Sequence, residues 1–377
     1  MDNSFITVPQ HSGTTAVAKR ERTGTPASPS VRNQKSRPRR ILYVGDTLDG
    51  STSRMRLETL QRLGHSVYAL PRFHPARGLV AKAITRVRWK LAHPPDSGLN
   101  QAVLTALSQS RPDVLWCDRS LDIRPETLKA AKLLNPSLKI VAYSVDDMLR
   151  QPHNQSVLYR RSIPLYDLHV TTKSYNLDDL AALGARHILF VNNAFSPRAH
   201  FPMQLSPSTR QKYGGPVGFV GTYECERAEM LLAMAKQGIP VRVWGGSWPE
   251  RLRSAAPNLR IEGRDLMADS YRLALNSFDI NLGFLRKISR DVQTTRSMEI
   301  PACGGFLLAE RSDEHRALFQ EDREAAYFSS TEELITKVQF YLENAPLRKK
   351  IAAEGFRRAV TAPYTYEAQL ENVLAQL

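Results

Sequence analysis

Two carboxylates, an arginine and a pair of glycines lie close together in one stretch of the sequence. Asp291 and Glu299 are eight positions apart, so a helix, which turns about 100° per residue, would place them about 80° apart on one broad face. Arg296 would lie beside Glu299, and Gly304-Gly305 would end the helix and let the backbone approach a ligand. Acids, a cation and bare backbone suit a ligand with hydroxyls and phosphates, such as a sugar nucleotide. The alternative is a surface helix with a common ion pair.

The composition is that of an ordinary globular protein. Of the 377 residues, 42% are hydrophobic and 24% are charged, and a chain of this length suggests two or three domains. No apolar run approaches the roughly eighteen residues of a membrane-spanning helix, and the first residues lack the apolar core of a secretory signal. The scattered Cys117, Cys225 and Cys303 predict buried, free thiols in a reducing compartment. We therefore expect a cytoplasmic protein.

The formal net charge of +15 is the unusual part of the composition. Residues 1–40 hold eight Lys and Arg and two acids, which is +6, and they are rich in Ser, Thr and Pro. Such a segment is expected to be disordered. The remaining +9 belongs to the folded part and predicts anionic partners, which are nucleotide phosphates, anionic lipid or nucleic acid.

Strand and helix patterns alternate along the rest of the chain. Residues 41–45 predict a strand, 55–63 a helix and 67–70 a second strand, which is the opening of a parallel sheet. Further strands are predicted at 114–117, 140–143, 168–170, 188–191, 217–220, 241–244, 259–261, 280–282 and 306–309. The expected fold class is α/β, with two Rossmann-like domains whose parallel sheets face each other across a cleft.

Proline and glycine divide this alternation into two parts. Pro197, Pro202, Pro207 and Pro216 mark a linker. In chain order, the sequence predicts a disordered basic tail at 1–38, an N-terminal domain at 39–195, a linker at 196–215, a C-terminal domain at 216–362 and a final helix at 363–377 that packs back on the N-terminal domain.

Polar residues follow several predicted strands and would gather at one sheet edge. Asp146-Asp147 is the sharpest pair, and either residue could act as a base or bind the hydroxyls of an acceptor. The alternative is that the pair caps the next helix. The same alternative applies to the Ser51-Thr52 turn after the first strand, which lacks a dinucleotide fingerprint.

Glycine turns follow two strands of the second half. Gly221-Thr222 comes directly after a strand, and Arg227 begins the next helix. A helix N-terminus preceded by glycine, with an arginine nearby, is suited to phosphate. Gly245 lies in a second turn of this kind. Together with the segment around Glu299, these turns indicate a phosphate-binding site in the C-terminal half.

Several runs of the second half resemble one family. They are Phe219-Val-Gly-Thr, the run Val243-Trp-Gly-Gly-Ser-Trp248, residues 291–315, and Thr365-Tyr366 before the last helix. They are similar to the bacterial CgeB-like glycosyltransferases, which have a "glycosyltransferase family 1" type C-terminal domain and the GT-B fold. The resemblance covers about residues 215–377 and is looser in the first half.

The resemblance implies a glycosyltransferase whose second domain holds a nucleotide sugar and whose first domain holds the acceptor. In related retaining enzymes two glutamates separated by seven residues flank the donor. Glu299 matches the later glutamate, which contacts the ribose, and Asp291 stands at the earlier position near the sugar. Asp is shorter than Glu, which leaves the sugar contact and the retaining or inverting outcome open. Arg227, Lys287 and Arg296 are the implied diphosphate ligands.

The expected chemistry needs no metal and no cofactor besides the donor. Fixed cations and backbone N–H groups stabilise a departing diphosphate without reorganising. The sequence has no Asp-x-Asp pair of the kind that holds a metal in glycosyltransferases of the other common fold. An inverting reaction would also need a base, for which Asp146, Asp147, Asp46 and His200 are the candidates.

Residues 79–91 carry an apolar stripe beside a basic face. This pattern is typical of a helix that lies on an anionic membrane, and the alternative is a docked helix with a solvated basic face. Membrane contact would suit a cell-envelope glycan or a lipid-linked acceptor. A protein acceptor remains open.

Two other function classes remain. One is a GT-B-fold enzyme with other chemistry, such as a sugar-nucleotide epimerase. The other is a non-catalytic protein that binds anions or nucleic acid, although no specific nucleic-acid motif is present.

Overall fold

The computed structural model describes residues 37–71, 98–119, 121–150 and 156–377. Almost all of the predicted basic tail and the whole of segment 79–91 lie outside the described residues. Hence the expectations of disorder and of membrane binding remain predictions.

The first sheet is formed by residues of the N-terminal half. Its six strands are all parallel and lie in the order β2-β1-β3-β4-β5-β6. The strands are β1 Arg40–Gly45, β2 Ser66–Pro71, β3 Val114–Asp118, β4 Lys139–Ser144, β5 Leu168–Thr171 and β6 Ile188–Phe190. The helices are α1 Thr52–Arg62, α3 Leu99–Ser110, α4 Pro125–Leu134, α5 Val157–Ser162 and α6 Asn176–Ala182, with a 3-10 turn, η1, at Ile163–Leu165.

The second sheet follows the same plan. Its six parallel strands lie in the order β12-β11-β10-β7-β8-β9. The strands are β7 Gly215–Val220, β8 Val241–Trp244, β9 Leu259–Ile261, β10 Phe278–Gly283, β11 Leu307–Glu310 and β12 Ala326–Phe328. The helices are α7 Pro207–Tyr213, α8 Cys225–Lys236, α9 Ala268–Ser277, α10 Arg296–Ala302, α11 Asp313–Leu318, α12 Thr331–Glu343 and α13 Ala345–Thr361, with 3-10 turns η2 at Glu250–Leu252 and η3 at Lys287–Ser289.

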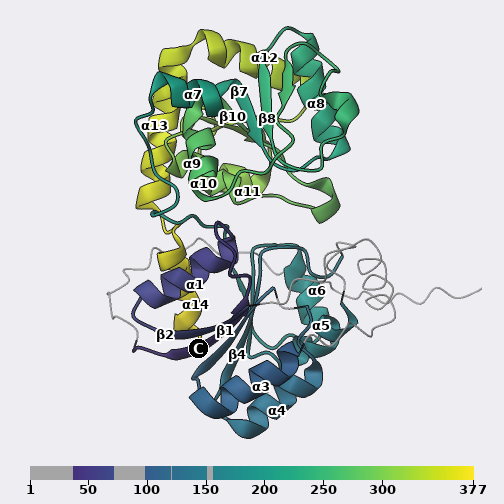
Figure 1. Ribbon diagram of the computed structural model, residues 1–377, viewed down its shortest axis with the longest axis vertical. Helices are drawn as coiled ribbons and strands as arrows, with labels where there is room; N and C mark the ends of the chain where they lie inside the picture. The colour runs from purple at the N-terminus through teal and green to yellow at the C-terminus, as the bar shows by residue number, and fades with distance from the viewer. Residues whose placement is uncertain (1–36, 72–97, 120, 151–155) are drawn as a thin grey trace, which may run out of the picture. The chain divides into compact units, whose positions relative to one another are not determined.

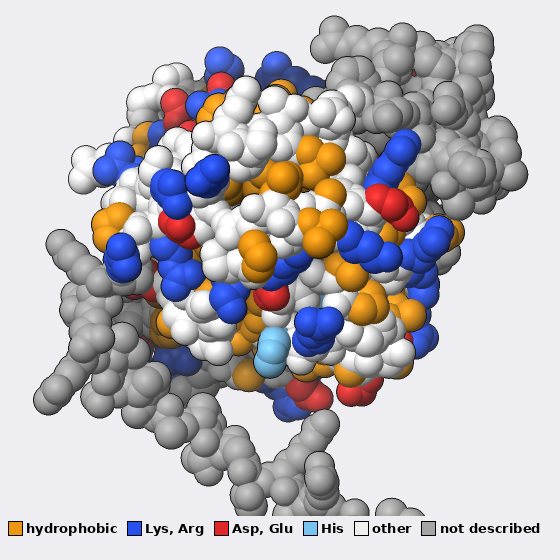
Figure 2. Space-filling model, turned by 90° about the horizontal axis from the view of Figure 1, so that it is seen from below, with side chains coloured by type: hydrophobic (Ala, Val, Ile, Leu, Met, Phe, Trp, Pro, Cys, Tyr) orange, Lys and Arg blue, Asp and Glu red, His pale blue; other side chains and the backbone are white. Residues whose placement is uncertain are grey.

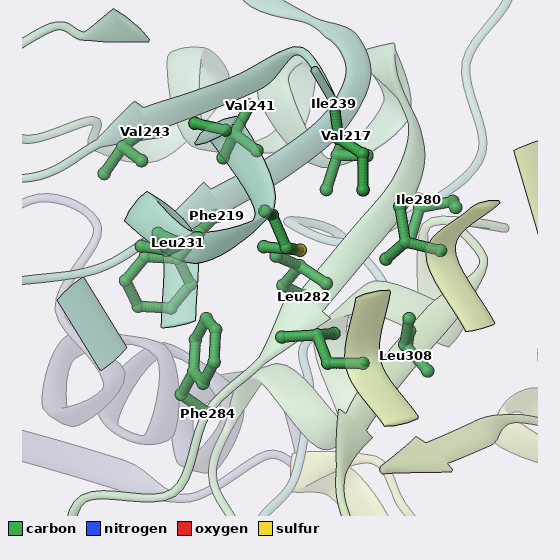
Figure 3. Packing of buried hydrophobic residues seen from close by; sticks show 14 of the residues in the cluster. Val217, Phe219, Leu231, Ile239, Val241, Val243, Ile280, Leu282, Phe284 and Leu308 are labelled. Atoms are coloured by element: carbon green, nitrogen blue, oxygen red, sulfur yellow. The ribbon is translucent and has the colours of Figure 1, made fainter. Parts of the chain in front are cut away.

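Both sheets are buried on both faces, which explains why their strands read as continuous apolar runs. Two clusters of buried hydrophobic side chains pack on opposite faces of each sheet. Figure 3 shows one of them, which includes Phe219 of β7, Leu231 of α8 and Phe284, just after β10. The aromatic rings of Phe219 and Phe284 meet edge to face at 5.1 Å.

The strand orders place one reversal point in each sheet. In the first sheet the chain places β2 on one side of β1 and then continues with β3 on the other side. In the second sheet β8 and β9 lie on one side of β7, and the chain then continues with β10 on the other side. Loops at the carboxyl ends of strands on either side of such a point diverge and leave a crevice for a ligand. The fold therefore predicts that residues after β1, β3, β7 and β10 form the site.

The last helix, α14 Tyr366–Ala375, packs on the first sheet (Figure 1). The Tyr143 hydroxyl donates to Gln369 Oε1 at 2.5 Å, and the Arg56 guanidinium lies 5.7 Å from the centre of the Tyr366 ring. Thr365 caps this helix by accepting from the Ala368 N–H group. The domain boundaries that the sequence suggested stay a prediction.

Two details differ from the sequence expectations. The helix expected to carry both Asp291 and Glu299 begins only at Arg296, so the prediction of one helix for both acids is wrong. Arg290 has φ 51°, a left-handed conformation that ends the preceding 3-10 turn and prevents a continuous helix. Strand β12 was not expected, because three residues carry too little periodicity to be recognised.

The basic excess of the composition is visible on the surface. Figure 2 shows Lys and Arg side chains spread around one face among hydrophobic and uncharged ones, without forming a single continuous patch. Among the described residues, no helix is long and apolar enough to cross a membrane. All three cysteines are free thiols, and Cys117 and Cys303 are buried as the sequence predicted. The prediction of burial is wrong for Cys225, which is exposed near the start of α8.

Candidate active site

A cavity of about 670 Å³ opens at the carboxyl ends of strands from both sheets. Its lining includes Asp46 after β1, Asp118-Arg119 at the end of β3, Gly221 after β7 and Arg286 after β10. These are the positions next to the two reversal points. The volume lies within the roughly 300–1,000 Å³ of small-molecule sites.

Two glycine turns form one wall of this cavity by packing backbone against backbone. The Gly221 N–H donates to the Trp244 carbonyl at 2.8 Å. A Cβ atom at Gly245 would lie 2.0 Å from the Gly221 carbonyl oxygen, and Gly245 has φ +142°. Only glycine satisfies both conditions at residue 245. Gly221, Thr222 and Gly245 all line the cavity.

Arg227 lies beneath the Gly221-Thr222 turn with its side chain 3% exposed. Its Nη1 donates to the Thr222 carbonyl at 3.2 Å and its Nη2 to Glu224 Oε2 at 3.0 Å, while its buried Nε has no partner among the described residues. Burial lowers the pKa of Arg227 to about 10; Glu224 opposes this shift, whereas Arg296 and Arg286 add to it. The guanidinium therefore stays charged at neutral pH in a cluster of like charges.

Arg296 and Arg286 complete this cluster. Arg296 Nε donates to the Val220 carbonyl at 2.6 Å, and Arg286 Nε donates to Glu224 Oε1 at 2.7 Å. Both line the cavity together with Arg227. Three guanidinium groups around a glycine turn form a cationic site whose charge suits a diphosphate.

Glu299 lies on α10 with 5% of its side chain exposed. The Tyr271 hydroxyl donates to its Oε2 at 2.5 Å. His200 Nε2 faces its Oε1 at 3.7 Å, and His200 Nδ1 accepts from the Ser196 N–H group at 3.3 Å. Burial lowers the pKa of His200, although the neighbouring Glu299 opposes this shift. The carboxylate is thus fixed on one side, and Oε1 remains available to the cavity.

Asp291 also lines the cavity but is ion-paired across it. Lys173, which follows β5 of the first sheet, places its Nζ 2.5 Å from Asp291 Oδ1. Burial raises the pKa of Asp291; Lys173 opposes this shift and the nearby Asp146 adds to it. Asp291 is therefore linked to the first-sheet side of the cavity.

The two acids after β4 have different surroundings. Asp146 lines the cavity and pairs with Arg119 Nε at 2.8 Å. Asp147 is fully buried, accepts from the Leu149 N–H group at 3.1 Å and pairs with Arg290 at 2.8 Å. Asp147 therefore caps the turn at residues 148–150. It does not cap the next described helix, α5, which is capped by Ser156.

The structure brings most of the sequence-predicted site residues together, but not all of them. Those that line the cavity are Asp146, Asp291, Gly221, Thr222, Arg227, Gly245, Arg296 and Glu299. Those outside its lining are Asp147, Lys287, Gly304 and Gly305. Lys287 pairs with Glu310 Oε1 at 2.8 Å, and Gly304, with φ +72°, ends α10. Their assignment as donor-binding or catalytic residues remains a prediction.

Several lining residues were not predicted from the sequence. Tyr271 belongs to no recognisable motif. A tyrosine within a helix is usually a core residue, so the sequence gave no reason to place it in the site. Arg286 adjoins Lys287, and only the three-dimensional path of the chain after β10 decides which of the two faces the cavity. Arg56 and Asp118 form a buried pair, with Arg56 Nε 2.7 Å from Asp118 Oδ2, and the sequence gave no sign that they meet.

Residues 227–375 match the family model described as "Glycosyl transferase-like". The structure is similar to Anabaena Alr3699/HepE in complex with UDP and glucose, with 13% identity, TM-score 0.62, and coverage of 90% of this chain and 100% of that one. Sucrose-phosphate synthase from Thermosynechococcus elongatus shows 12% identity, TM-score 0.61, and coverage of 90% and 99%. A Listeria monocytogenes protein provisionally described as a UDP-N-acetylglucosamine 2-epimerase shows 12% identity, TM-score 0.53, and coverage of 90% and 95%. No curated protein sequence matches the chain.

At this level of identity the similar structures establish the fold. The predicted GT-B-like architecture of two parallel α/β sheets is therefore confirmed. The match over residues 227–375 confirms the prediction of a glycosyltransferase, with a glycosyltransferase-type domain in the C-terminal half. The narrower resemblance to the CgeB-like group stays a prediction.

Proposed function

We propose that the protein transfers a sugar from a nucleotide-sugar donor, bound at the second sheet, to an acceptor bound at the first. The observation that carries this proposal is the placement of Glu299 and three arginines in one cavity at the β7/β10 reversal point. A carboxylate suits the ribose hydroxyls, and clustered guanidinium groups suit the diphosphate. The nucleotide-bound neighbour HepE has the same fold, which supports the assignment.

The donor contacts follow from the side chains around the cavity. Glu299 Oε1 accepts from the ribose hydroxyls while Tyr271 holds Oε2. Arg227, Arg286 and Arg296 bind the diphosphate with the backbone of the Gly221-Thr222 turn. The absence of side chains at Gly221 and Gly245 lets the two turns pack closely. The backbone of both turns lines the cavity, where its N–H groups can bind the phosphates.

Catalysis in this proposal depends on fixed positive charge. As the bond from the sugar to the diphosphate breaks, negative charge grows on the departing phosphate, and the arginines stabilise it without reorganising. This explains how transfer can proceed without a metal.

The acceptor side offers one carboxylate that faces the cavity after β4. We propose Asp146 as the base in an inverting reaction, with Asp46 and His200 as the other lining candidates. A retaining reaction would need no such base. The anomeric configuration of the product separates the two routes.

An epimerase is the second candidate, because the Listeria protein with the epimerase description shares the fold. Incubation with a nucleotide sugar distinguishes the two. Transfer or hydrolysis releases the nucleoside diphosphate, whereas epimerisation returns an isomeric nucleotide sugar. The third possibility, anion or nucleic-acid binding, predicts binding without any release.

The experiment that tests the proposal is a thermal-shift screen of nucleoside diphosphates and nucleotide sugars, followed by assay of diphosphate release. Selective binding raises the melting temperature by mass action and ranks base and sugar together. We expect one nucleotide class to stabilise the protein and its sugar conjugate to be consumed. Absence of any stabilising nucleotide would refute the proposal.

We also propose a cytoplasmic location, which the free thiols support. Contact with an anionic membrane through residues 79–91 remains a hypothesis about residues outside those described. Flotation with anionic liposomes tests it.

A further inference from the structure

His200 and Glu299 lie side by side at the lining of the cavity, and each presents a polar atom without a hydrogen bond. The His200 side chain is 1% exposed and that of Glu299 is 5% exposed. His200 Nε2 lies 3.7 Å from Glu299 Oε1, which is too long for a hydrogen bond. Among the described residues, neither of these two atoms has a hydrogen-bond partner. Both atoms therefore remain available to a ligand in the cavity.

The surroundings of His200 determine which of its ring nitrogens carries the proton. The Ser196 N–H group donates to His200 Nδ1 at 3.3 Å, so Nδ1 is an acceptor. Burial lowers the pKa of His200; the charge of Glu299 opposes this shift and that of Arg272 adds to it. The ring is therefore neutral at pH 7 and carries a single proton. That proton lies on Nε2, so His200 presents an N–H donor beside the Glu299 carboxylate.

One helix, α9, positions the groups on either side of Glu299. Asn276 of this helix donates from its Nδ2 atom to the Phe201 carbonyl at 3.2 Å, which fixes the segment that carries His200. Tyr271 of the same helix donates to Glu299 Oε2 at 2.5 Å. The rings of His200 and Tyr271 meet edge to face, with their centres 6.0 Å apart. The position of the His200 donor relative to the carboxylate is thus set by packing and does not depend on a ligand.

We propose that His200 is a second ribose-binding residue, and that one ribose hydroxyl of the donor binds between His200 Nε2 and Glu299 Oε1. The hydroxyl oxygen accepts from the Nε2–H group, and the hydroxyl hydrogen is donated to Oε1. Such hydrogen bonds are about 2.7–3.0 Å long, and two atoms 3.7 Å apart can both lie at this distance from one oxygen. The proposal rests on the proposed function, because it assigns a contact to the nucleotide of that reaction.

This role gives His200 a function in specificity and removes it from the candidate bases. Its Nδ1 lone pair is occupied by the Ser196 N–H group and its Nε2 carries the proton, so neither nitrogen can take a proton from an acceptor hydroxyl. Together, His200 and Glu299 require a group that accepts and donates at one position. A hydroxyl does so, whereas a deoxyribose carbon leaves a buried N–H and a buried carboxylate oxygen unpaired. We therefore expect the site to prefer ribonucleotides to deoxyribonucleotides.

The test is isothermal titration calorimetry of the full-length protein with the nucleoside diphosphate that the thermal-shift screen selects and with its 2′-deoxy and 3′-deoxy analogues. His200→Phe keeps an aromatic ring and removes the N–H donor. We expect it to weaken binding of the ribonucleotide about fivefold, as for the loss of one neutral hydrogen bond. In the wild type, removal of either hydroxyl should weaken binding. In His200→Phe this effect should shrink about fivefold for one of the two analogues and stay unchanged for the other.

Two further variants provide controls. His200→Gln places an amide N–H the same number of bonds from Cβ as His200 Nε2, so we expect its Kd for the ribonucleotide to stay within about twofold of the wild-type value. Glu299→Gln should reduce the effect of both deoxy analogues, because Oε1 accepts from the ribose hydroxyls. Thermal melts of each variant report whether the fold is retained.

The wild type provides a second readout that does not depend on the folding of any variant. In the protein labelled with ¹⁵N-histidine, the ring nitrogen shifts distinguish the two neutral tautomers, and comparison with His200→Gln assigns the signals. We expect His200 to carry its proton on Nε2 at pH 7. Binding of the ribonucleotide should shift the Nε2 signal, and binding of the 2′,3′-dideoxy analogue should leave it unchanged.

The outcomes separate this inference from the proposed function. If His200→Phe reduces the effect of both deoxy analogues equally, His200 acts only by holding Glu299, and the direct contact is overturned. Unchanged effects of both analogues in His200→Phe, or a proton on Nδ1, would also overturn it. These results would leave the proposed function in place, whereas failure of the protein to bind any nucleotide would overturn both.

Discussion

Replacing Arg286 and Lys287 one at a time provides a strong test of the diphosphate site. These adjacent residues have the same charge, and each is paired with a glutamate, Arg286 with Glu224 at 2.7 Å and Lys287 with Glu310 at 2.8 Å. Only Arg286 lines the cavity. We therefore expect Arg286→Ala to weaken nucleoside diphosphate binding. We expect Lys287→Ala to leave it within about twofold, since Lys287 is 54% exposed and lies outside the cavity lining, so solvent screens its charge from the ligand.

The magnitude follows from burial. A hydrogen bond to a charged group contributes about 1.5–3 kcal/mol. Arg286 is 37% exposed, so solvent screens part of this interaction and the lower end applies. A loss of about 1.4 kcal/mol corresponds to a tenfold weaker Kd. Glu224 retains its pair with Arg227 at 3.0 Å, so the fold should lose less than about 1 kcal/mol.

The assay is isothermal titration calorimetry of both variants and the wild type with the best nucleoside diphosphate, together with thermal melts. A tenfold weaker Kd for Arg286→Ala at nearly unchanged melting temperature supports the arrangement of the arginines. A larger loss of affinity in Lys287→Ala than in Arg286→Ala would refute it.

Three further predictions concern the turn, the metal and the pH dependence of stability. Gly245→Ala should cost about 1–3 kcal/mol and weaken nucleotide binding, because its Cβ would meet the Gly221 carbonyl at 2.0 Å; Gly64→Ala, at φ +89° with no neighbour within 4 Å, should leave binding unchanged. Activity should persist in excess chelator, and restoration of lost activity by Mn²⁺ or Mg²⁺ would show that a metal is required. Burial lowers the pKa of His169 to about 4. Between about pH 6.5 and pH 4 this histidine therefore binds more protons in the unfolded chain than in the folded protein. The fold thus loses stability as the pH falls, by about 2 kcal/mol at pH 5. His169→Gln should remove this loss in urea titrations at pH 7 and pH 5, whereas a substitution of exposed His187 should not; equal pH dependence in wild type and His169→Gln would count against this cause.

The strands were predictable because buried parallel strands carry a strong local signal. Runs such as Ile140–Tyr143 are apolar throughout, and packing on both sheet faces demands this. The irregular path between Ser289 and Arg296 was not predictable. It depends on contacts distant in sequence, such as the Gln293 side chain accepting from the Asn193 N–H group at 2.9 Å.

The site was predictable where a residue type was tied to a local backbone requirement. Gly221 and Gly245 belong to this class, because their turns need bare backbone. Tyr271 and Arg56 belong to the opposite class, since their partners Glu299 and Asp118 are brought to them only by tertiary packing. Charge pairing across a cavity is invisible in a sequence without its fold.

The central claim is that Glu299 binds the ribose of an activated sugar. It is tested most directly by titrating the wild type and Glu299→Gln with the best nucleoside diphosphate and with its 2′,3′-dideoxy analogue. The account predicts that Glu299→Gln weakens binding of the ribonucleotide about tenfold and leaves binding of the analogue unchanged, because only the former has hydroxyls to donate. Equal losses for both ligands, or no loss for either, would contradict it.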